Sequence, residues 1–175
     1  MAALAARAGA TSDIAEATDR FNRVQIKWLA ELVRRHHDGK GAIGILGLTY
    51  KPHTDVVEES FGLLLAQELS TANLPVIVYD PSADADRALI ACQAVYVARS
   101  AQECIEQSSV AVLATPWPEF REIPVEQWAR HGPPRKVIDC WRVLTHLDGA
   151  DGVRYVRLGF GGDIERAAGT PLSVG

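Results

Sequence analysis

A tyrosine and a lysine, Tyr50 and Lys51, follow the apolar segment 42–48 and are the residues best suited to ligand chemistry. An aromatic ring offers a flat face to a base or sugar, and an ammonium group neutralises a phosphate or donates to a hydroxyl. For this pair taken alone, a surface lysine beside a packed tyrosine is the favoured interpretation. Dinucleotide-binding folds place a Gly-x-Gly-x-x-Gly turn here, whose glycines let the backbone approach a pyrophosphate. This loop lacks them, so we expect no NAD binding in the usual manner.

Two further polar residues follow apolar segments. Asp80 comes after segment 75–79, where doubly wound folds often hold a ribose hydroxyl. A turn follows at once, so a capping role is the favoured interpretation of Asp80. Arg142 comes after segment 136–141 and is a second candidate for a phosphate or carboxylate contact. The alternative for Arg142 is an ion pair with a neighbouring acid such as Asp139.

The segment 115–120, Thr-Pro-Trp-Pro-Glu-Phe, contains two large aromatic residues. Its two prolines predict an extended exit from the preceding strand. We expect Trp117 and Phe120 to anchor this loop to the core rather than to stack on a ligand.

Strand and helix patterns alternate from residue 41 to about residue 161. Several strand candidates are near-continuous apolar runs, which are typical of strands buried on both faces of a parallel sheet. The sequence therefore predicts an α/β fold, a doubly wound (Rossmann-like), mostly parallel sheet of five to six strands, preceded by a long helix. The expected strands are 42–48, 75–79, 94–98, 110–115, 136–141 and 154–158. The expected helices are 56–72, with Asp55 as its cap, 83–92, 101–107 and 125–131.

The long helix is expected over residues 11–37. Asp13 and Glu16 have the spacing of a capping box, and Gly39 suits the left-handed position after a helix. An apolar stripe with helical spacing runs along one face, formed by Ile14, Ala17, Phe21, Val24, Trp28 and Leu32. On pattern alone, packing of this stripe on its own domain is favoured over pairing with another subunit.

Composition excludes several classes of protein. The 175 residues are 47% hydrophobic and 23% charged with a net charge of −4, which suits one globular domain. No basic stripe indicates nucleic acid, and no apolar run approaches the roughly 20 residues that span a membrane. Three scattered cysteines, Cys92, Cys104 and Cys140, favour neither a disulfide scaffold nor a metal site, so we expect no metal. The cytoplasm is the expected location.

Four motifs together resemble the C-terminal UDP-binding domain of the UDP-glucose/GDP-mannose dehydrogenase family, the nucleotide-sugar 6-dehydrogenases. They are Gly-Leu-Thr-Tyr-Lys-Pro at 47–52, Val-Tyr-Asp-Pro at 78–81, Thr-x-Trp-x-Glu-Phe at 115–120 and Ile-Asp-x-x-Arg at 138–142. The segments 4–9, 14–17 and 21–25 resemble the end of the central helical domain of that family. The resemblance implies that residues 1–40 end a helical dimerisation domain, that 41–162 form a UDP-binding Rossmann-like domain, and that 163–175 form a tail.

The resemblance also implies an activity, which is NAD-dependent oxidation of the C6 alcohol of a nucleotide sugar to a carboxylate. Tyr50, Lys51 and Arg142 would then bind the substrate, a UDP-sugar by preference, and the long helix would form a homodimer. The NAD fingerprint and the Gly-Phe-Gly-Gly-Ser-Cys segment with the catalytic cysteine of the family are both missing. We therefore assign no catalytic residue and no bound cofactor, and expect an NAD-binding domain or chain as a partner.

The chain also departs from the family pattern. Glu58 replaces an arginine in Arg-Glu-Ser, and Trp141 replaces an arginine that contacts substrate in relatives. Three interpretations follow: the substrate-binding portion of such a dehydrogenase, a non-enzymatic dimeric nucleotide-sugar-binding or structural module descended from the family, and an unrelated enzyme that uses NAD itself. The missing glycine fingerprint makes the third the weakest.

Overall fold

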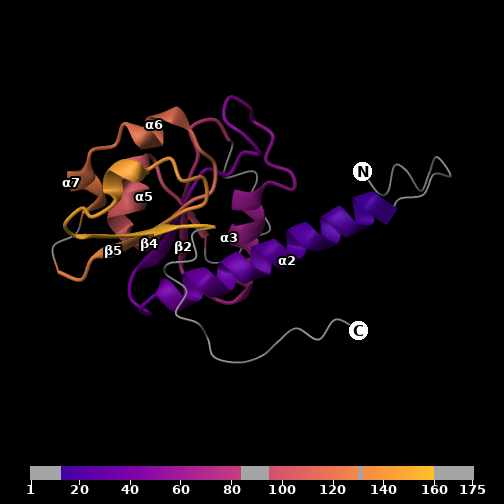
Figure 1. Cartoon of the computed structure of the whole chain (residues 1–175), viewed down its shortest axis with the longest axis horizontal. Coiled ribbons are helices and arrows are strands. Elements are labelled where there is room, and N and C mark those ends of the chain that lie inside the picture. Colours follow the sequence, from indigo (N-terminus) through magenta and orange to yellow (C-terminus); the bar gives the residue numbers. More distant parts are fainter. Residues whose placement is uncertain (1–12, 84–94, 130–131, 160–175) are drawn as a thin grey trace.

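The computed structural model describes residues 13–83, 95–129 and 132–159. One sheet of parallel strands forms its centre, as Figure 1 shows. The strands are β1 (Ala42–Leu46), β2 (Val76–Tyr79), β3 (Val95–Val97), β4 (Ser108–Leu113), β5 (Arg135–Asp139) and β6 (Val153–Arg157). Their order is β3-β2-β1-β4-β5-β6, so the direction of winding reverses between β1 and β4. The predicted doubly wound α/β fold is confirmed, and each strand ends within two residues of its expected bounds.

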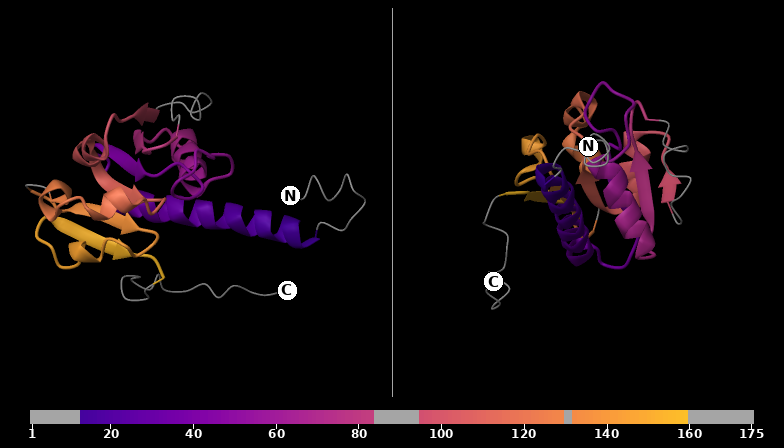
Figure 2. Two further views of the ribbon diagram at one scale, coloured as in Figure 1. Left: turned by 90° about the horizontal axis from the view of Figure 1, so that it is seen from above. Right: turned by 90° about the vertical axis from the view of Figure 1, so that its right-hand side faces the viewer.

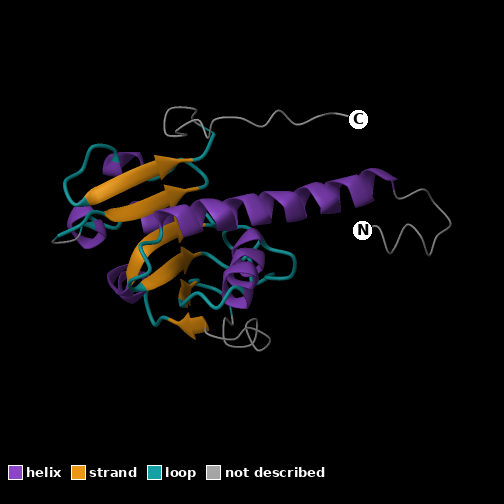
Figure 3. Ribbon diagram, turned by 90° about the horizontal axis from the view of Figure 1, so that it is seen from below, coloured by secondary structure: helices purple, strands orange, loops and turns teal. Residues whose placement is uncertain are grey.

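Helices cover both faces of the sheet. They are α2 (Asp13–His36), α3 (Phe61–Thr71), α5 (Ala101–Gln107), α6 (Pro118–Arg121) and α7 (Val125–Trp128), with a 3₁₀ turn, η1, at Thr145–Leu147. One core cluster joins α2 and α3 to the sheet, and a second joins α5, α6, α7 and η1 to it. Figure 3 shows the long helix α2 against the strands.

Alternate residues of the central strands enter the two clusters. Ile43 and Ile45 of β1 pack in the cluster with α2 and α3, whereas Leu46 packs in the other cluster. All three are fully buried. Because successive strand side chains point to opposite faces, a strand buried on both faces must be apolar throughout, as the sequence predicted.

Helix α3 begins five residues later than expected. Residues 50–59 form a loop, closed by the Tyr50 amide, which donates to the Val56 carbonyl over 2.8 Å. The hydroxyl of Ser60, not Asp55, caps the helix and accepts from the Leu63 amide over 3.2 Å. Glu59 has a φ of 55°, which no residue of a continuous α-helix adopts. The predicted cap at Asp55 was therefore wrong, because a tertiary loop takes up the first turns of the predicted helix.

Two other expectations need correction. The prolines of segment 115–120 lead into the short helix α6, with Pro118 in its first turn, rather than into an extended exit. Helix α7 has four residues, so it is shorter than the expected 125–131. The helix expected at 83–92 lies almost wholly outside the described residues, and the tail at 163–175 lies entirely outside them.

Only the C-terminal half of α2 packs on the sheet. Leu29, Ala30 and Val33 lie in the core, whereas the N-terminal half projects past the strands, as Figure 2 shows. Gly39, after the helix, has the predicted left-handed conformation with a φ of 77°. The apolar stripe is exposed at Ile14, Phe21, Val24 and Trp28. Its predicted packing on the same domain was wrong at these positions, because residues on another face of α2 make the core contacts.

No helix in the described part of the chain is long and apolar enough to cross a membrane.

Candidate functional site

The loop after β1 lies at the switch point of the sheet, where ligands bind in open α/β folds. Gly47 has a φ of 97°, and a Cβ atom there would lie 2.6 Å from the Thr115 nitrogen. The β1 loop therefore lies tightly against the β4 loop. Leu48 and Thr49 are buried, and Tyr50 and Lys51 then emerge into solvent. Tyr50 is 66% exposed.

Asp80, at the end of β2, holds the β1 loop in place. One carboxylate oxygen, Oδ2, accepts from the Leu48 amide at 2.7 Å and from the Thr49 amide and hydroxyl, each at 2.9 Å. The other oxygen, Oδ1, accepts from the amides of Ser82 and Ala83, each at 2.9 Å. The carboxylate, on a residue only 8% exposed, is thus occupied by protein donors. The favoured capping interpretation of Asp80 fits this geometry, and a ribose contact does not.

The same contacts decide whether the β1 loop could bind NAD in the usual manner. A dinucleotide fold presents the amides after its first strand to a pyrophosphate. Here the amides of Leu48 and Thr49 donate to Asp80, and α3 starts only at Phe61. The β1 loop therefore does not fit a dinucleotide in the usual manner.

The loop after β4 also holds the β1 loop in place, and together with Asp80 it forms a buried anchor for that loop. The Thr115 hydroxyl donates to the Thr49 carbonyl over 2.7 Å, and the Trp117 indole N–H donates to the Thr49 hydroxyl at 3.1 Å and to Asp80 at 3.2 Å. His53 packs edge-on against Trp117, with 5.4 Å between the ring centroids. Trp117 and Phe120 are buried, which confirms their predicted anchoring role.

A second buried aspartate, Asp139, orders the loop after β5. Its Oδ1 accepts from the amides of Trp141 at 2.9 Å and Arg142 at 2.8 Å. Its Oδ2 accepts from the Leu144 amide and the Tyr155 hydroxyl, both at 2.7 Å. Burial, together with this bond to the Asp139 carboxylate, raises the pKa of Tyr155 above its ordinary value. The Asp139 carboxylate thus accepts from the backbone amide of Arg142 and not from its guanidinium. The ion pair considered from the sequence therefore does not form.

The predicted site residues do not form one cluster. Tyr50 and Lys51 follow β1, whereas Arg142 follows β5, and β4 lies between these two strands. Within the described residues, no hydrogen bond or ion pair joins the side chains of Tyr50, Lys51 and Arg142. A guanidinium nitrogen of Arg142 lies 3.9 Å from the place of a Cβ on Gly159, beyond the end of β6. Arg142 therefore reaches toward β6, away from Lys51.

The sequence analysis did not name Thr49 and Trp141 among the candidate site residues, although both have side chains bonded to these loops. Thr49 is 1% exposed and bonds to Asp80, Thr115 and Trp117. Trp141 is 50% exposed, and its indole N–H donates to the Ala114 carbonyl after β4 over 2.8 Å. The replacement of a family arginine by Trp141 was the available signal, but the direction of the ring depends on the tertiary structure.

Neither described cysteine is suited to nucleophilic chemistry. Burial raises the pKa of the Cys104 thiol to about 12, so the thiol stays protonated near neutral pH. Burial and the Asp139 charge raise the pKa of Cys140 as well. Across the described ranges, no group of three or more histidine, cysteine or acidic residues could hold a metal ion.

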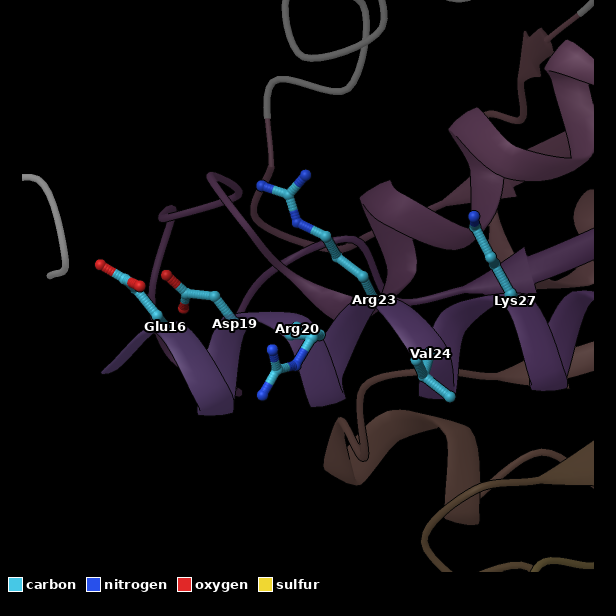
Figure 4. Close-up of a pocket in the computed structure, with 6 residues that line it drawn as sticks. All are labelled: Glu16, Asp19, Arg20, Arg23, Val24 and Lys27. Carbon is cyan, nitrogen blue, oxygen red and sulfur yellow. The ribbon is translucent and has the colours of Figure 1, made fainter. Parts of the chain in front are cut away.

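The hollow in Figure 4 lies along α2, mostly on its projecting half. A single helix supplies its whole lining, which consists of Glu16, Asp19, Arg20, Arg23, Val24 and Lys27. A hollow with one wall does not enclose a ligand, so we treat it as a charged flank of α2 beside the apolar stripe.

Comparison with known proteins gives a consistent result. The UDP-binding domain of the UDP-glucose/GDP-mannose dehydrogenase family matches residues 44–146. The UDP-glucose 6-dehydrogenase AglM of Haloferax volcanii is 34% identical over 74% of this chain, and the UDP-glucose 6-dehydrogenase YwqF of Bacillus subtilis is 28% identical over 67%. These matches cover only 30% and 27% of the two relatives, so the chain spans less than a third of their length.

Solved structures share the fold. A UDP-glucose dehydrogenase from Pyrobaculum islandicum aligns with a TM-score of 0.66 at 23% identity, over 87% of this chain and 34% of its own. A GDP-mannose dehydrogenase from Pseudomonas aeruginosa aligns with a TM-score of 0.63 at 19% identity, over 87% and 35%.

Proposed function

Because this chain belongs to the UDP-glucose/GDP-mannose dehydrogenase family, we propose that it binds a nucleotide sugar, a UDP-sugar by preference. In this proposal it is the C-terminal substrate-binding portion of an NAD-dependent enzyme that oxidises the C6 alcohol of the sugar to a carboxylate. The observation that carries the proposal is the exposed pair Tyr50 and Lys51 at the switch point, held there by a buried anchor.

Each residue of the pair has a distinct role. The Tyr50 ring offers a face to the base or the sugar, and the Lys51 ammonium neutralises the diphosphate. Asp80 positions both through the Thr49 backbone without contacting the ligand. Because Arg142 reaches toward β6, it contacts only a ligand that extends across the β5 loop.

The oxidation itself requires parts that the described residues do not supply. The β1 loop does not fit a dinucleotide, and the raised pKa values of Cys104 and Cys140 keep both described thiols protonated near neutral pH. NAD binding and covalent catalysis are therefore assigned to another domain or chain, in keeping with the coverage of less than a third of each curated relative.

We also propose that α2 forms a homodimer. Its exposed stripe includes two large aromatic side chains, Phe21 at 61% and Trp28 at 49% exposure. Together they expose a large apolar surface to solvent. If two α2 helices pair antiparallel about Phe21, Ile14 of one lies opposite Trp28 of the other. Glu16 then lies near Lys27 of the partner subunit, so the charged flanks of the two copies are complementary.

The division into residues 1–40, 41–162 and 163–175 and a cytoplasmic location are part of the same proposal. The family match at 44–146 falls within the second segment. Cys104 and Cys140 are free thiols, which suit a reducing compartment.

A second candidate is a non-enzymatic nucleotide-sugar-binding module. Trp141 and Glu58 favour it, because both remove a positive charge that the family pattern places near the ligand.

A calorimetric titration with UDP-glucose, and with NAD in parallel, tests the proposal. We expect saturable binding of UDP-glucose and no response to NAD. Lys51→Ala should weaken binding at least about tenfold, since a charge-assisted contact contributes roughly 1.5–3 kcal/mol. Lys40→Ala is the matched control, because Lys40 is exposed at the opposite, amino end of β1. Absence of UDP-glucose binding, or equal binding by the two variants, would overturn the site assignment. Turnover on adding an NAD-binding half separates the dehydrogenase from the non-enzymatic module.

A further inference from the structure

Trp141 has an unusually well-fixed side chain for a residue that is 50% exposed. Its backbone amide donates to Asp139 over 2.9 Å, and its indole N–H donates to the Ala114 carbonyl over 2.8 Å. The first bond fixes the main chain, and the second fixes the edge of the ring. The remaining indole surface is therefore a flat apolar face held in one orientation at the carboxyl edge of the sheet.

The ring and its neighbour Arg142 extend in opposite directions. Trp141 reaches the end of β4, whereas the Arg142 guanidinium lies beside Gly159 beyond β6. Because β5 lies between β4 and β6, Trp141 is the one of the two that extends toward the switch point. The side chain on the Lys51 side of the β5 loop is thus aromatic and uncharged.

A short series of contacts joins Trp141 to Tyr50. The indole bonds to Ala114, the next residue, Thr115, bonds to the Thr49 carbonyl, and Thr49 precedes Tyr50. The β1 and β5 loops that carry these two exposed aromatic residues therefore lie on either side of the β4 loop, and both loops bond to it. The other exposed aromatic residues of the described chain lie on α2 and β3.

We propose that Trp141 is a specificity-determining contact that stacks on a ring of the bound nucleotide sugar. The proposal rests on the nucleotide-sugar binding proposed above. It adds that the β5 loop recognises the flat face of a ligand ring and not an anionic group of the ligand. Nucleobases and the C–H faces of sugars share this chemistry. Lys51 then carries the charge recognition at the β1 loop, and Trp141 carries the ring recognition at the β5 loop.

Three variants test this role by calorimetry and by tryptophan fluorescence. Trp141→Ala should weaken UDP-glucose binding about tenfold, since stacking of a base on an aromatic side chain contributes roughly 1–3 kcal/mol. Trp141→Phe should retain most of the affinity, because it keeps a ring face. Tyr96→Ala, on the edge strand β3 at 47% exposure, is the matched control and should bind as the unaltered chain does. UDP-glucose should quench emission in the unaltered chain, and Trp141→Phe should lose the quenching.

Fragments of the ligand distinguish the two rings. Weaker uridine binding by Trp141→Ala assigns the contact to the base, and weaker glucose 1-phosphate binding assigns it to the sugar. Equal UDP-glucose affinity of Trp141→Ala and the unaltered chain would overturn the inference but leave the proposed function standing. Equally weak binding by a folded Trp141→Phe would also overturn it, since the ring is then not what the ligand contacts. If the unaltered chain binds no UDP-glucose, both proposals fail.

Discussion

A Cβ atom on Gly62 would overlap the carbonyl oxygen of Gly47 and lie 3.1 Å from its carbonyl carbon. The first turn of α3 thus approaches the β1 loop as closely as a glycine permits. The Ser60 hydroxyl strengthens this contact by donating to the Leu48 carbonyl. The loop that carries Tyr50 and Lys51 is therefore enclosed by α3 on one side and by the β4 loop on the other.

Gly62→Ala should lower the free energy of unfolding by at least about 2 kcal/mol, because the obstructing atom is backbone and cannot move aside without displacing the loop. Urea denaturation measures the change. Gln67→Ala is the control in the same helix, at a partly exposed position, and should change stability by less than about 0.5 kcal/mol. Equal stability of the two variants would contradict the close approach.

Asp80→Asn should destabilise the fold by roughly 2–4 kcal/mol. The amide nitrogen of asparagine faces N–H donors wherever it points, so at least one buried donor loses its acceptor. Asp38→Asn is the control, because Asp38 is exposed and accepts one bond, from the Lys40 amide at 3.0 Å. Similar urea midpoints for the two variants would show that Asp80 does not hold the loop.

Stability should fall at alkaline pH partly through Tyr155. The pKa of Tyr155 is higher in the folded chain than in the unfolded chain, where it is about 10. Folding therefore favours the neutral phenol. This contribution is fully present below pH 10 and is lost as pH rises through the folded pKa. Tyr155→Phe should lower stability by about 1–2 kcal/mol at pH 7 and should flatten the decline above pH 10.

Tyr96→Phe serves as the comparison for Tyr155, since the Tyr96 hydroxyl makes one exposed bond, to Glu103 at 3.1 Å. Urea unfolding at pH 7, 9, 10 and 11 measures all three chains. A decline as steep in Tyr155→Phe as in the unaltered chain would assign the alkaline loss to other groups.

Trp28→Glu should convert a dimer to monomers, because it places a charge within the exposed stripe of α2. Sedimentation velocity measures the change. Asn22→Glu adds the same side chain on the projecting half of the helix, outside the stripe, and should leave the dimer intact. If the unaltered chain sediments as a monomer, or if the two variants behave alike, the stripe does not form the interface.

The sequence by itself determined the parallel sheet, the bounds of its strands and the long helix. These features depend on local patterns, since buried strands are apolar throughout and helices repeat their apolar residues every three to four positions. The sequence also determined that Tyr50 and Lys51 stand at the end of the first strand, because that strand ends at a glycine. Motif likeness then indicated the family, which the match at 44–146 confirmed.

Only the tertiary structure decided where α3 begins, what the two aspartates hold and which residue of the β5 loop extends toward the switch point. Asp80 bonds to an amide 32 residues away in the chain, and Trp141 to a carbonyl 27 residues away. Such contacts depend on which strand ends are neighbours in the sheet, and no local pattern carries that information. Trp141 and Arg142 are adjacent in sequence, yet they extend toward different strands because β5 lies between β4 and β6.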